Sequence, residues 1–293
     1  MKTLTEMFEL AGGSTIGRDH RDQIRPKNGQ DAYGVRFTDN GIIALVVDGC
    51  GSGKHSEVGA KIGLQMLLQS MSVHLPRFLQ ARCLAITSPK KTKPFDFWQR
   101  ICDDVLAQLR VLACQMGGSF SRVVNDYFLF TVVGVIITKW TSFFFSLGDG
   151  LFIVNDEIFQ SGPFPDNEPP YLAYNLVETS LKNKNPDLLK IKLHRIVATS
   201  KLNSFLFGSD GLVDLLAAYN KPLPGKDELV GPIDQFWTED GFFRNRDKVN
   251  RRLALTAQTV TRVNWTDQHM LTDAGLLPDD TPLIVGRRTK VLE

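Results

Sequence analysis

The chain has 293 residues, 43% hydrophobic and 23% charged, which is an ordinary balance for a soluble globular protein with a sizeable core. Its formal net charge of +2 is too close to neutrality to indicate nucleic-acid binding. The four cysteines form no Cys-x-x-Cys pair and have no histidine-rich partner segment, so we expect reduced thiols, no zinc site and a cytoplasmic protein. Acidic residues interrupt the segment Met1–Glu9, which therefore does not predict a secretory signal.

Taken in chain order, the sequence predicts a group of strands with two long amphipathic helices inserted after the second strand. The predicted strands are Ala32–Phe37, Ile42–Val47, Phe128–Thr138, Thr141–Leu147, Leu151–Val154, Ile158–Gln160, Ile191–Ser200, Ser204–Phe207 and Thr281–Arg287. The predicted helices are Glu57–Leu75, Phe95–Met116, Leu212–Ala218 and Lys248–Thr261. Short connections in the middle group of strands indicate an antiparallel meander, and the proline-bearing segment Ser161–Asn185 is expected to be irregular.

This grouping predicts an α+β fold in which two antiparallel β-sheets pack as a sandwich with helices on the outer faces. The sequence contains no linker, so one domain over residues 1–293 is expected.

One stretch, Tyr127–Leu147, imitates a membrane span because Lys139 is its single formally charged residue. Its many Val, Ile, Thr and Phe residues, and the polar break at Thr138–Thr141, fit two strands and a tight connection better. We therefore expect no membrane partner. A membrane-anchored regulator is the alternative that this stretch leaves open.

Aspartates follow several of the predicted strands. The apolar run Ile42–Val47 is followed by Asp48 and Gly49, and an unpaired carboxylate at the end of a buried strand is costly unless a cation pairs with it. A lone Asp-Gly is also a common turn. The pattern recurs, however, at Asp149 and at Asp210, and another acidic pair, Asp279-Asp280, precedes the last strand. Carboxylates delivered by separate strand ends predict an oxygen-rich site suited to magnesium or manganese.

The order of these strand-end aspartates, with Gln30-Asp31-Ala32 ahead of them, resembles the metal-dependent protein phosphatases of the 2C type, in the shorter bacterial form. The resemblance runs from about Gly17 to Arg287. It implies a hydrolase that removes phosphate from phosphoserine or phosphothreonine on a protein, in a signalling pathway with a partner Ser/Thr kinase.

The metal ligands that the resemblance implies are Asp48, Gly49, Asp210, Asp279 and Asp149. Asp48 is expected to bridge two ions, Mn²⁺ or Mg²⁺, with the Gly49 carbonyl on one of them. Asp210 and Asp279 would hold the other ion. Asp149, together with Asp210 and Asp214 as further candidates, matches the position of a third, more loosely held ion.

The resemblance also assigns catalytic roles. Asp31 matches the acidic residue that holds metal-bound water. Arg18, His20 and Arg25 lie where relatives place a basic residue that grips the substrate phosphate, and solvated surface positions are the alternative for the two arginines.

Two positions depart from the family pattern. Gln30 stands where glutamate is frequent, and Cys50 stands where longer relatives have a histidine that is a candidate general acid. General-acid help is typically worth ~100- to 10,000-fold, so its loss slows the reaction without abolishing it. His20 or His55 could substitute, or both could be surface residues.

Two functions follow from these residues. The first is an active metal-dependent phosphatase, favoured because Asp48, Asp210 and Asp279 are all retained. The second is a catalytically silent relative that binds phosphoproteins or acts as a scaffold in a kinase pathway.

Overall fold

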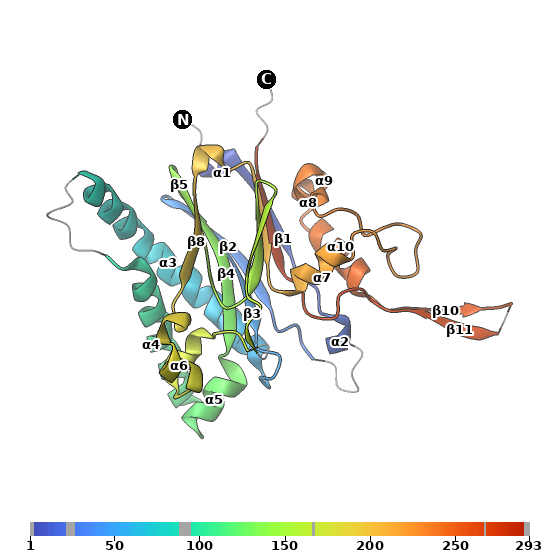
Figure 1. Ribbon diagram of the computed structural model, residues 1–293, viewed down its shortest axis with the longest axis horizontal. Helices are drawn as coiled ribbons and strands as arrows, with labels where there is room; N and C mark the ends of the chain where they lie inside the picture. The colour runs from blue at the N-terminus through green and yellow to red at the C-terminus, as the bar shows by residue number, and fades with distance from the viewer. Residues whose placement is uncertain (1–2, 22–26, 88–94, 166–167, 267, 290–293) are drawn as a thin grey trace.

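The computed structural model describes residues 3–21, 27–87, 95–165, 168–266 and 268–289 of the chain. Two five-stranded antiparallel sheets form its centre (Figure 1). Sheet A consists, in spatial order, of β1 (Phe8–Gly13), β12 (Leu283–Arg288), β9 (Ser204–Gly208), β6 (Gly150–Val154) and β7 (Glu157–Ser161). Sheet B consists of β2 (Ala32–Thr38), β3 (Gly41–Gly49), β4 (Phe130–Ile137), β5 (Thr141–Leu147) and β8 (Lys192–Ala198).

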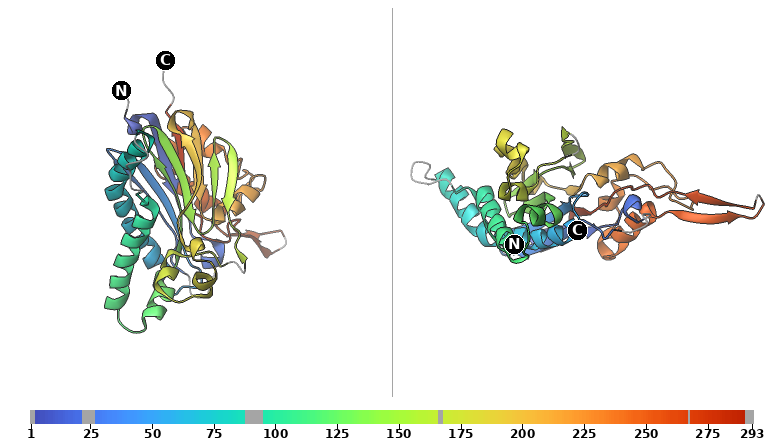
Figure 2. Two further views of the ribbon diagram at one scale, coloured as in Figure 1. Left: turned by 60° about the vertical axis from the view of Figure 1, so that its left-hand side comes forward. Right: turned by 90° about the horizontal axis from the view of Figure 1, so that it is seen from below.

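Helices cover the outer face of each sheet (Figures 1 and 2). Sheet B packs against α3 (Ser56–Thr87) and α4 (Phe97–Gln115), and sheet A against α7 (Gly211–Ala217), α8 (Gln235–Thr238), α9 (Gly241–Arg244) and α10 (Lys248–Ala257). The remaining elements are α1 (Leu4–Met7), α2 (Arg18–Arg21), α5 (Phe120–Tyr127), α6 (Ser180–Lys184) and the 3-10 turns Leu172–Leu176, Pro186–Leu189 and Thr199–Lys201. The predicted α+β sandwich with outer helices is thus confirmed.

The sandwich interior is aromatic. Phe144 of sheet B meets Phe152 and Phe205 of sheet A edge to face, at ring-centroid distances of 6.2 and 6.1 Å. All three rings are fully buried, and each such pair adds about 0.5–1.5 kcal/mol beyond the burial of its area. This contact fixes the sheets face to face, so that strand ends of both sheets meet at one edge.

The two long helices lie close to their predicted positions. In α4, Ile101, Val105 and Leu109 recur at helical spacing and are fully buried, and the Asp96 side chain caps the helix by accepting from Gln99 N at 3.0 Å. Helix α3 continues to Thr87 with Pro76 inside it, beyond the predicted end at Leu75.

The predicted meander is wrong in one respect. β5 and β6 are consecutive in the chain but lie in different sheets. The change of sheet occurs at Gly148 and Gly150, which have φ angles of 93° and 151° that side-chain-bearing residues rarely adopt. Asp149 lies between these two glycines, at the point where the chain crosses from sheet B to sheet A.

Several elements were not predicted. β1 precedes the first predicted strand and pairs with the last strand, β12. Helix α5 begins at Phe120, shortly after α4 ends at Gln115. The predicted helix Lys248–Thr261 ends at Ala257, and a hairpin of β10 (Val260–Asn264) and β11 (His269–Asp273) follows. The hairpin extends away from the sandwich (Figure 2), and among the described residues its strands pair only with each other.

None of the helices in the described part of the chain combines the length and apolar character that crossing a membrane requires. The stretch Tyr127–Leu147 forms the end of α5 and the strands β4 and β5, as expected from its composition.

Candidate metal centre

Asp48 and Asp31 are brought together by the first two strands of sheet B. The register pairs Ala32 with Val47, so the two carboxyl groups lie side by side and hydrogen-bond to each other. Burial raises the pKa of both groups well above the ordinary range, and for Asp48 the charge of Asp31 raises it further. Oδ2 of Asp31 is buried, and no described residue hydrogen-bonds to it. The pair thus presents a buried acceptor oxygen that the described residues leave unsatisfied.

Gly49 follows Asp48 in a place where a side chain does not fit. A Cβ atom at this position would lie 2.6 Å from the carbonyl oxygen of Gln30. The backbone at the end of β3 therefore packs directly against the backbone of Gln30, which precedes Asp31.

Asp149 is buried at the crossing between the sheets. Burial raises the pKa of its carboxyl group, and the charge of Asp279 raises it further. The preceding carbonyl, that of Gly148, accepts hydrogen bonds from Ser161 Oγ at 2.8 Å and Ser146 Oγ at 3.2 Å. These contacts hold the crossing that carries Asp149.

Asp210 lies between the end of β9 and the start of α7. Burial raises the pKa of its carboxyl group to about 6, and the charges of Asp149 and Asp279 add to the rise. One turn further along α7, the pKa of Asp214 is also raised, mainly by burial and then by Asp279. The carboxyl group of Asp210, next to a strand of sheet A, therefore lies close enough to Asp48 of sheet B for their charges to interact.

The two members of the acidic pair before β12 have different surroundings. The Asp280 side chain is only 2% exposed and accepts hydrogen bonds from Gly17 N at 2.8 Å and Gln30 N at 2.6 Å. The Asp279 side chain is 56% exposed. Asp280 therefore anchors two loops, and Asp279 remains open to solvent.

A cavity of about 400 Å³ opens beside these groups. It is lined by Asp19, His20, Asp210, Gly211, Asp214, Pro278 and Asp279. Asp48, Asp31 and Asp149 lie outside this lining, yet their charges act on one another and on Asp210, so the carboxylates of both sheets form one group.

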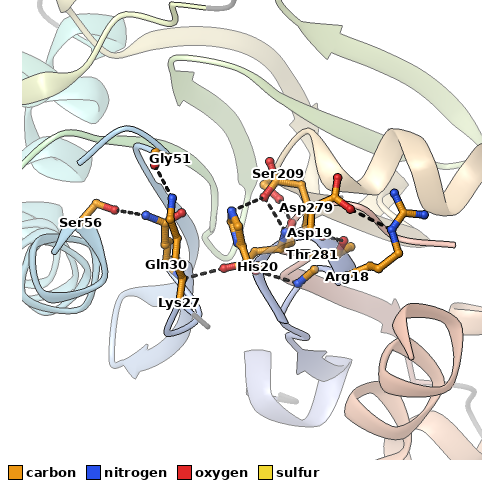
Figure 3. Close-up of polar contacts among 12 residues, drawn as sticks. Arg18, Asp19, His20, Lys27, Gln30, Gly51, Ser56, Ser209, Asp279 and Thr281 are labelled. Atoms are coloured by element: carbon orange, nitrogen blue, oxygen red, sulfur yellow. Dashed lines mark hydrogen bonds and ion pairs between the residues drawn. The ribbon is translucent and has the colours of Figure 1, made fainter. Parts of the chain in front are cut away.

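Of the basic residues predicted to grip phosphate, His20 lines the cavity and Arg18 does not. Arg18 donates to Asp19 at 2.8 Å (Figure 3) and to Gly275 O at 2.9 Å. Arg25 lies outside the described residues. His20 Nδ1 lies 2.9 Å from Asp280 Oδ1, and this hydrogen bond raises the pKa of the imidazole.

Sequence reasoning missed several supporting contacts. The buried Cys50 thiol lies 3.1 Å from Ser52 Oγ and hydrogen-bonds to the hydroxyl of Tyr171, a residue in the segment expected to be irregular. Burial, and then this bond, raise the pKa of Tyr171. Lys27 donates to Gly51 O at 2.8 Å (Figure 3). The Asp48 loop is thus held from both sides, and spacing in the sequence carries no signal for such long-range contacts.

The donor set fits hard divalent cations. Besides burial, the negative charges of neighbouring aspartates raise the pKa of Asp48, Asp149 and Asp210, and Asp279 contributes to all three shifts. When these carboxyl groups are ionised, they therefore repel one another. A cation between them would relieve this repulsion, and carboxylate oxygens are the ligands that Mg²⁺ and Mn²⁺ take in proteins. The unsatisfied Oδ2 of Asp31 adds an acceptor to the same group.

Solved structures show the class to which this fold belongs. The chain is similar to a bacterial serine phosphatase at 15% identity and a TM-score of 0.50, covering 97% of this chain and 100% of that one. It is similar to a variant of a bacterial serine phosphatase at 16% identity and a TM-score of 0.51, with coverage of 97% and 100%. The catalytic domain of serine threonine protein phosphatase PstP, in complex with two manganese ions, has a TM-score of 0.48 at 14% identity, with coverage of 97% and 99%. The sandwich has the fold of the bacterial serine phosphatases.

The family follows from the sequence itself. The family model described as Protein phosphatase 2C matches residues 16–256, and the chain belongs to this family. No curated protein sequence matches the chain. The resemblance noted in the order of the strand-end aspartates is thereby confirmed.

Proposed function

We propose that the chain is a metal-dependent phosphatase that hydrolyses phosphoserine and phosphothreonine in proteins. The observation that carries the proposal is that Asp210 and Asp279, next to strands of sheet A, line one acidic cavity and that their charges act on the buried Asp48 of sheet B beside it. Membership of the protein phosphatase 2C family supports the class of reaction.

Asp48 and the Gly49 carbonyl, with Asp210 and Asp279, are the residues proposed to hold two ions, Mn²⁺ or Mg²⁺, and Asp149 is proposed to contribute to a third. When bound, such ions lower the pKa of water and neutralise phosphate oxygens. Asp31, with its free buried oxygen, would orient that water.

The reaction consumes one water for each phosphoester. The water oxygen bonds to phosphorus, the bond from phosphorus to the serine or threonine oxygen breaks, and the alkoxide takes up a proton. Cations held by Asp48, Asp210 and Asp279 would neutralise the phosphate charge, so no protein nucleophile is required. We place this activity in the cytoplasm, acting against a partner Ser/Thr kinase.

Hydrolysis of a phosphothreonine peptide by the full chain tests the proposal. We expect phosphate release with Mn²⁺ and its loss with chelator. Tight Mn²⁺ binding without any release from peptide or aryl phosphate would instead support the catalytically silent, phosphoprotein-binding role.

A further inference from the structure

Both ring nitrogens of His20 lie near carboxylates, a contact pattern that suits a metal ligand. Its side chain is 13% exposed and lies in the wall of the acidic cavity (Figure 3). Nδ1 lies 2.9 Å from Asp280 Oδ1, and Nε2 lies 3.7 Å from Asp279 Oδ1. Both ring nitrogens therefore face carboxylates, one at hydrogen-bonding distance and one beyond it.

Asp280 fixes the orientation of the ring. Its carboxylate already accepts from Gly17 N at 2.8 Å and Gln30 N at 2.6 Å, and it is almost fully buried. Since a carboxylate accepts, Nδ1 is the donor, and in the neutral ring the lone pair is then on Nε2. Histidines that bind metals usually donate the other ring N–H to such a carboxylate, which sets the tautomer and the ring orientation.

Nε2 is directed at the residue expected to hold a cation. The separation of 3.7 Å from Asp279 Oδ1 is too long for a hydrogen bond. It is short enough for one cation to contact both atoms, because metal–ligand bonds of about 2.0–2.2 Å each span up to about 4 Å. His20, Asp279 and Asp280 place one donor atom each within 4.8 Å of one another. The buried Oδ2 of Asp31 accepts no hydrogen bond from the described residues, and the charges of Asp279 and Asp280 act on this carboxyl group, so it is a second, independent observation that favours a cation at this group.

We propose that Nε2 of His20, oriented by Asp280, is a ligand of the divalent cation held by Asp279, and that this nitrogen makes the site prefer Mn²⁺ to Mg²⁺. The inference rests on the proposed function, because it concerns the same site. An imidazole is a good ligand for transition-metal ions, whereas Mg²⁺ takes oxygen ligands almost exclusively. The other side chains with ligand atoms that line the cavity are aspartates, so His20 supplies its nitrogen ligand and sets this preference.

Pulsed electron paramagnetic resonance of the Mn²⁺-loaded full chain tests the ligand directly. We expect modulation from a directly coordinated ¹⁴N nucleus, replaced by a ¹⁵N pattern when the histidines are ¹⁵N-labelled. His20→Gln should lose the signal. His269→Gln, the same change on the exposed hairpin strand, should keep it. The wild-type measurement is decisive even if His20→Gln does not fold.

Calorimetric titration with Mn²⁺ and Mg²⁺ tests the preference. We expect His20→Gln to weaken Mn²⁺ binding by roughly 10-fold or more, the scale known for disturbed metal–histidine sites, and Mg²⁺ binding by much less. Mn²⁺ binding without nitrogen coupling would overturn the inference and leave the proposed function standing. No Mn²⁺ binding at all would overturn both.

Discussion

The side-chain amide of Gln30 donates a 2.7 Å hydrogen bond to Ser56 Oγ (Figure 3), at the first turn of α3, and a 3.3 Å bond to the carbonyl of Cys50. One neutral side chain thereby ties the Asp48 loop to the long helix. The family frequently has glutamate here, and a glutamate could not donate to the Cys50 carbonyl.

We expect Gln30→Glu to destabilise the metal-free protein by about 1–3 kcal/mol, because the amide hydrogen bonds to Ser56 and to the Cys50 carbonyl, which keeps Gly53 N as a second donor, are lost and a charge is added beside Asp280. Urea unfolding in the presence of chelator measures this change. Gln65→Glu, the same replacement on the exposed side of α3, is the matched control and should leave the midpoint nearly unchanged. Equal stability of Gln30→Glu and the parent would mean that the amide bonds contribute nothing.

Asp48→Asn should lower phosphatase activity by at least about 100-fold, the scale seen when one electrostatic group of an active site is removed. A carboxamide cannot bridge two cations as a carboxylate does. Because burial, and then the charges of neighbouring aspartates, raise the pKa of Asp48, the metal-free variant should be at least as stable as the parent. Initial rates at saturating Mn²⁺ and thermal melting in chelator provide the two readouts, with Asp39→Asn on the exposed β2–β3 turn as control. Normal turnover by Asp48→Asn would exclude the bridging role.

The pKa of Asp210 predicts how stability changes with pH in the metal-free protein. Its folded pKa of about 6 lies above its ordinary value of 3.8, so the folded state holds this proton more tightly than the unfolded state. The stabilisation is complete below pH ~4 and is lost as the pH rises through 6.

Asp210→Asn should therefore equal the parent near pH 4 and become the more stable protein above pH 6, by up to about 3 kcal/mol. Urea unfolding across this range in chelator measures the difference, and adding Mg²⁺ should reverse it in favour of the parent. A difference that does not vary with pH would show that Asp210 is not crowded.

Cys50 tests whether the site lacks a general acid. Cys50→Ser should change the rate little on either an aryl phosphate or a phosphothreonine peptide. Cys50→His should raise the peptide rate relative to the aryl phosphate rate by roughly tenfold or more, because only the alkoxide leaving group needs a proton. The larger imidazole must displace Tyr171 or Ser52, so folding is checked by thermal melting.

The same pair of substrates separates two roles for His20. His20→Ala should slow both reactions if the imidazole binds the cation, and the peptide reaction alone if it donates the proton. His55→Ala tests the other histidine. Identical rates for all these variants on both substrates would show that proton donation does not limit the rate.

The sequence predicted which aspartates follow the strands, but it did not predict the long-range hydrogen bonds that these residues make. Apolar runs that stop at Asp48 and Asp210 are local signals, and the structure brings both residues into one acidic group. The separate behaviour of Asp279 and Asp280 was not predictable, because it depends on Gly17 and Gln30, which are more than 200 positions away in the chain. The metal and catalytic roles stay predictions, as does the single domain.

The elements that were missed have physical reasons. Phe8–Gly13 ends in two glycines and lacks a strong alternation, and it becomes a strand because β12 offers it a partner. The hairpin strands are mostly exposed, so no buried face produces a period in the sequence. Arg18 has the sequence position at which relatives place a phosphate-gripping residue. Its guanidinium instead donates hydrogen bonds to Asp19 and to the carbonyl of Gly275.

The hairpin of β10 and β11 is closed at its base. Val260 pairs with Asp273, Gly275 N donates to Thr259 Oγ1 at 3.3 Å, and Leu276 N donates to Thr256 O at 2.8 Å. These bonds fix the spacing between α10 and the segment that leads to Asp279, and they do not depend on the rest of the hairpin. The hairpin is therefore a place where the chain can be shortened, replaced or given a fluorescent label while the acidic cavity keeps its shape.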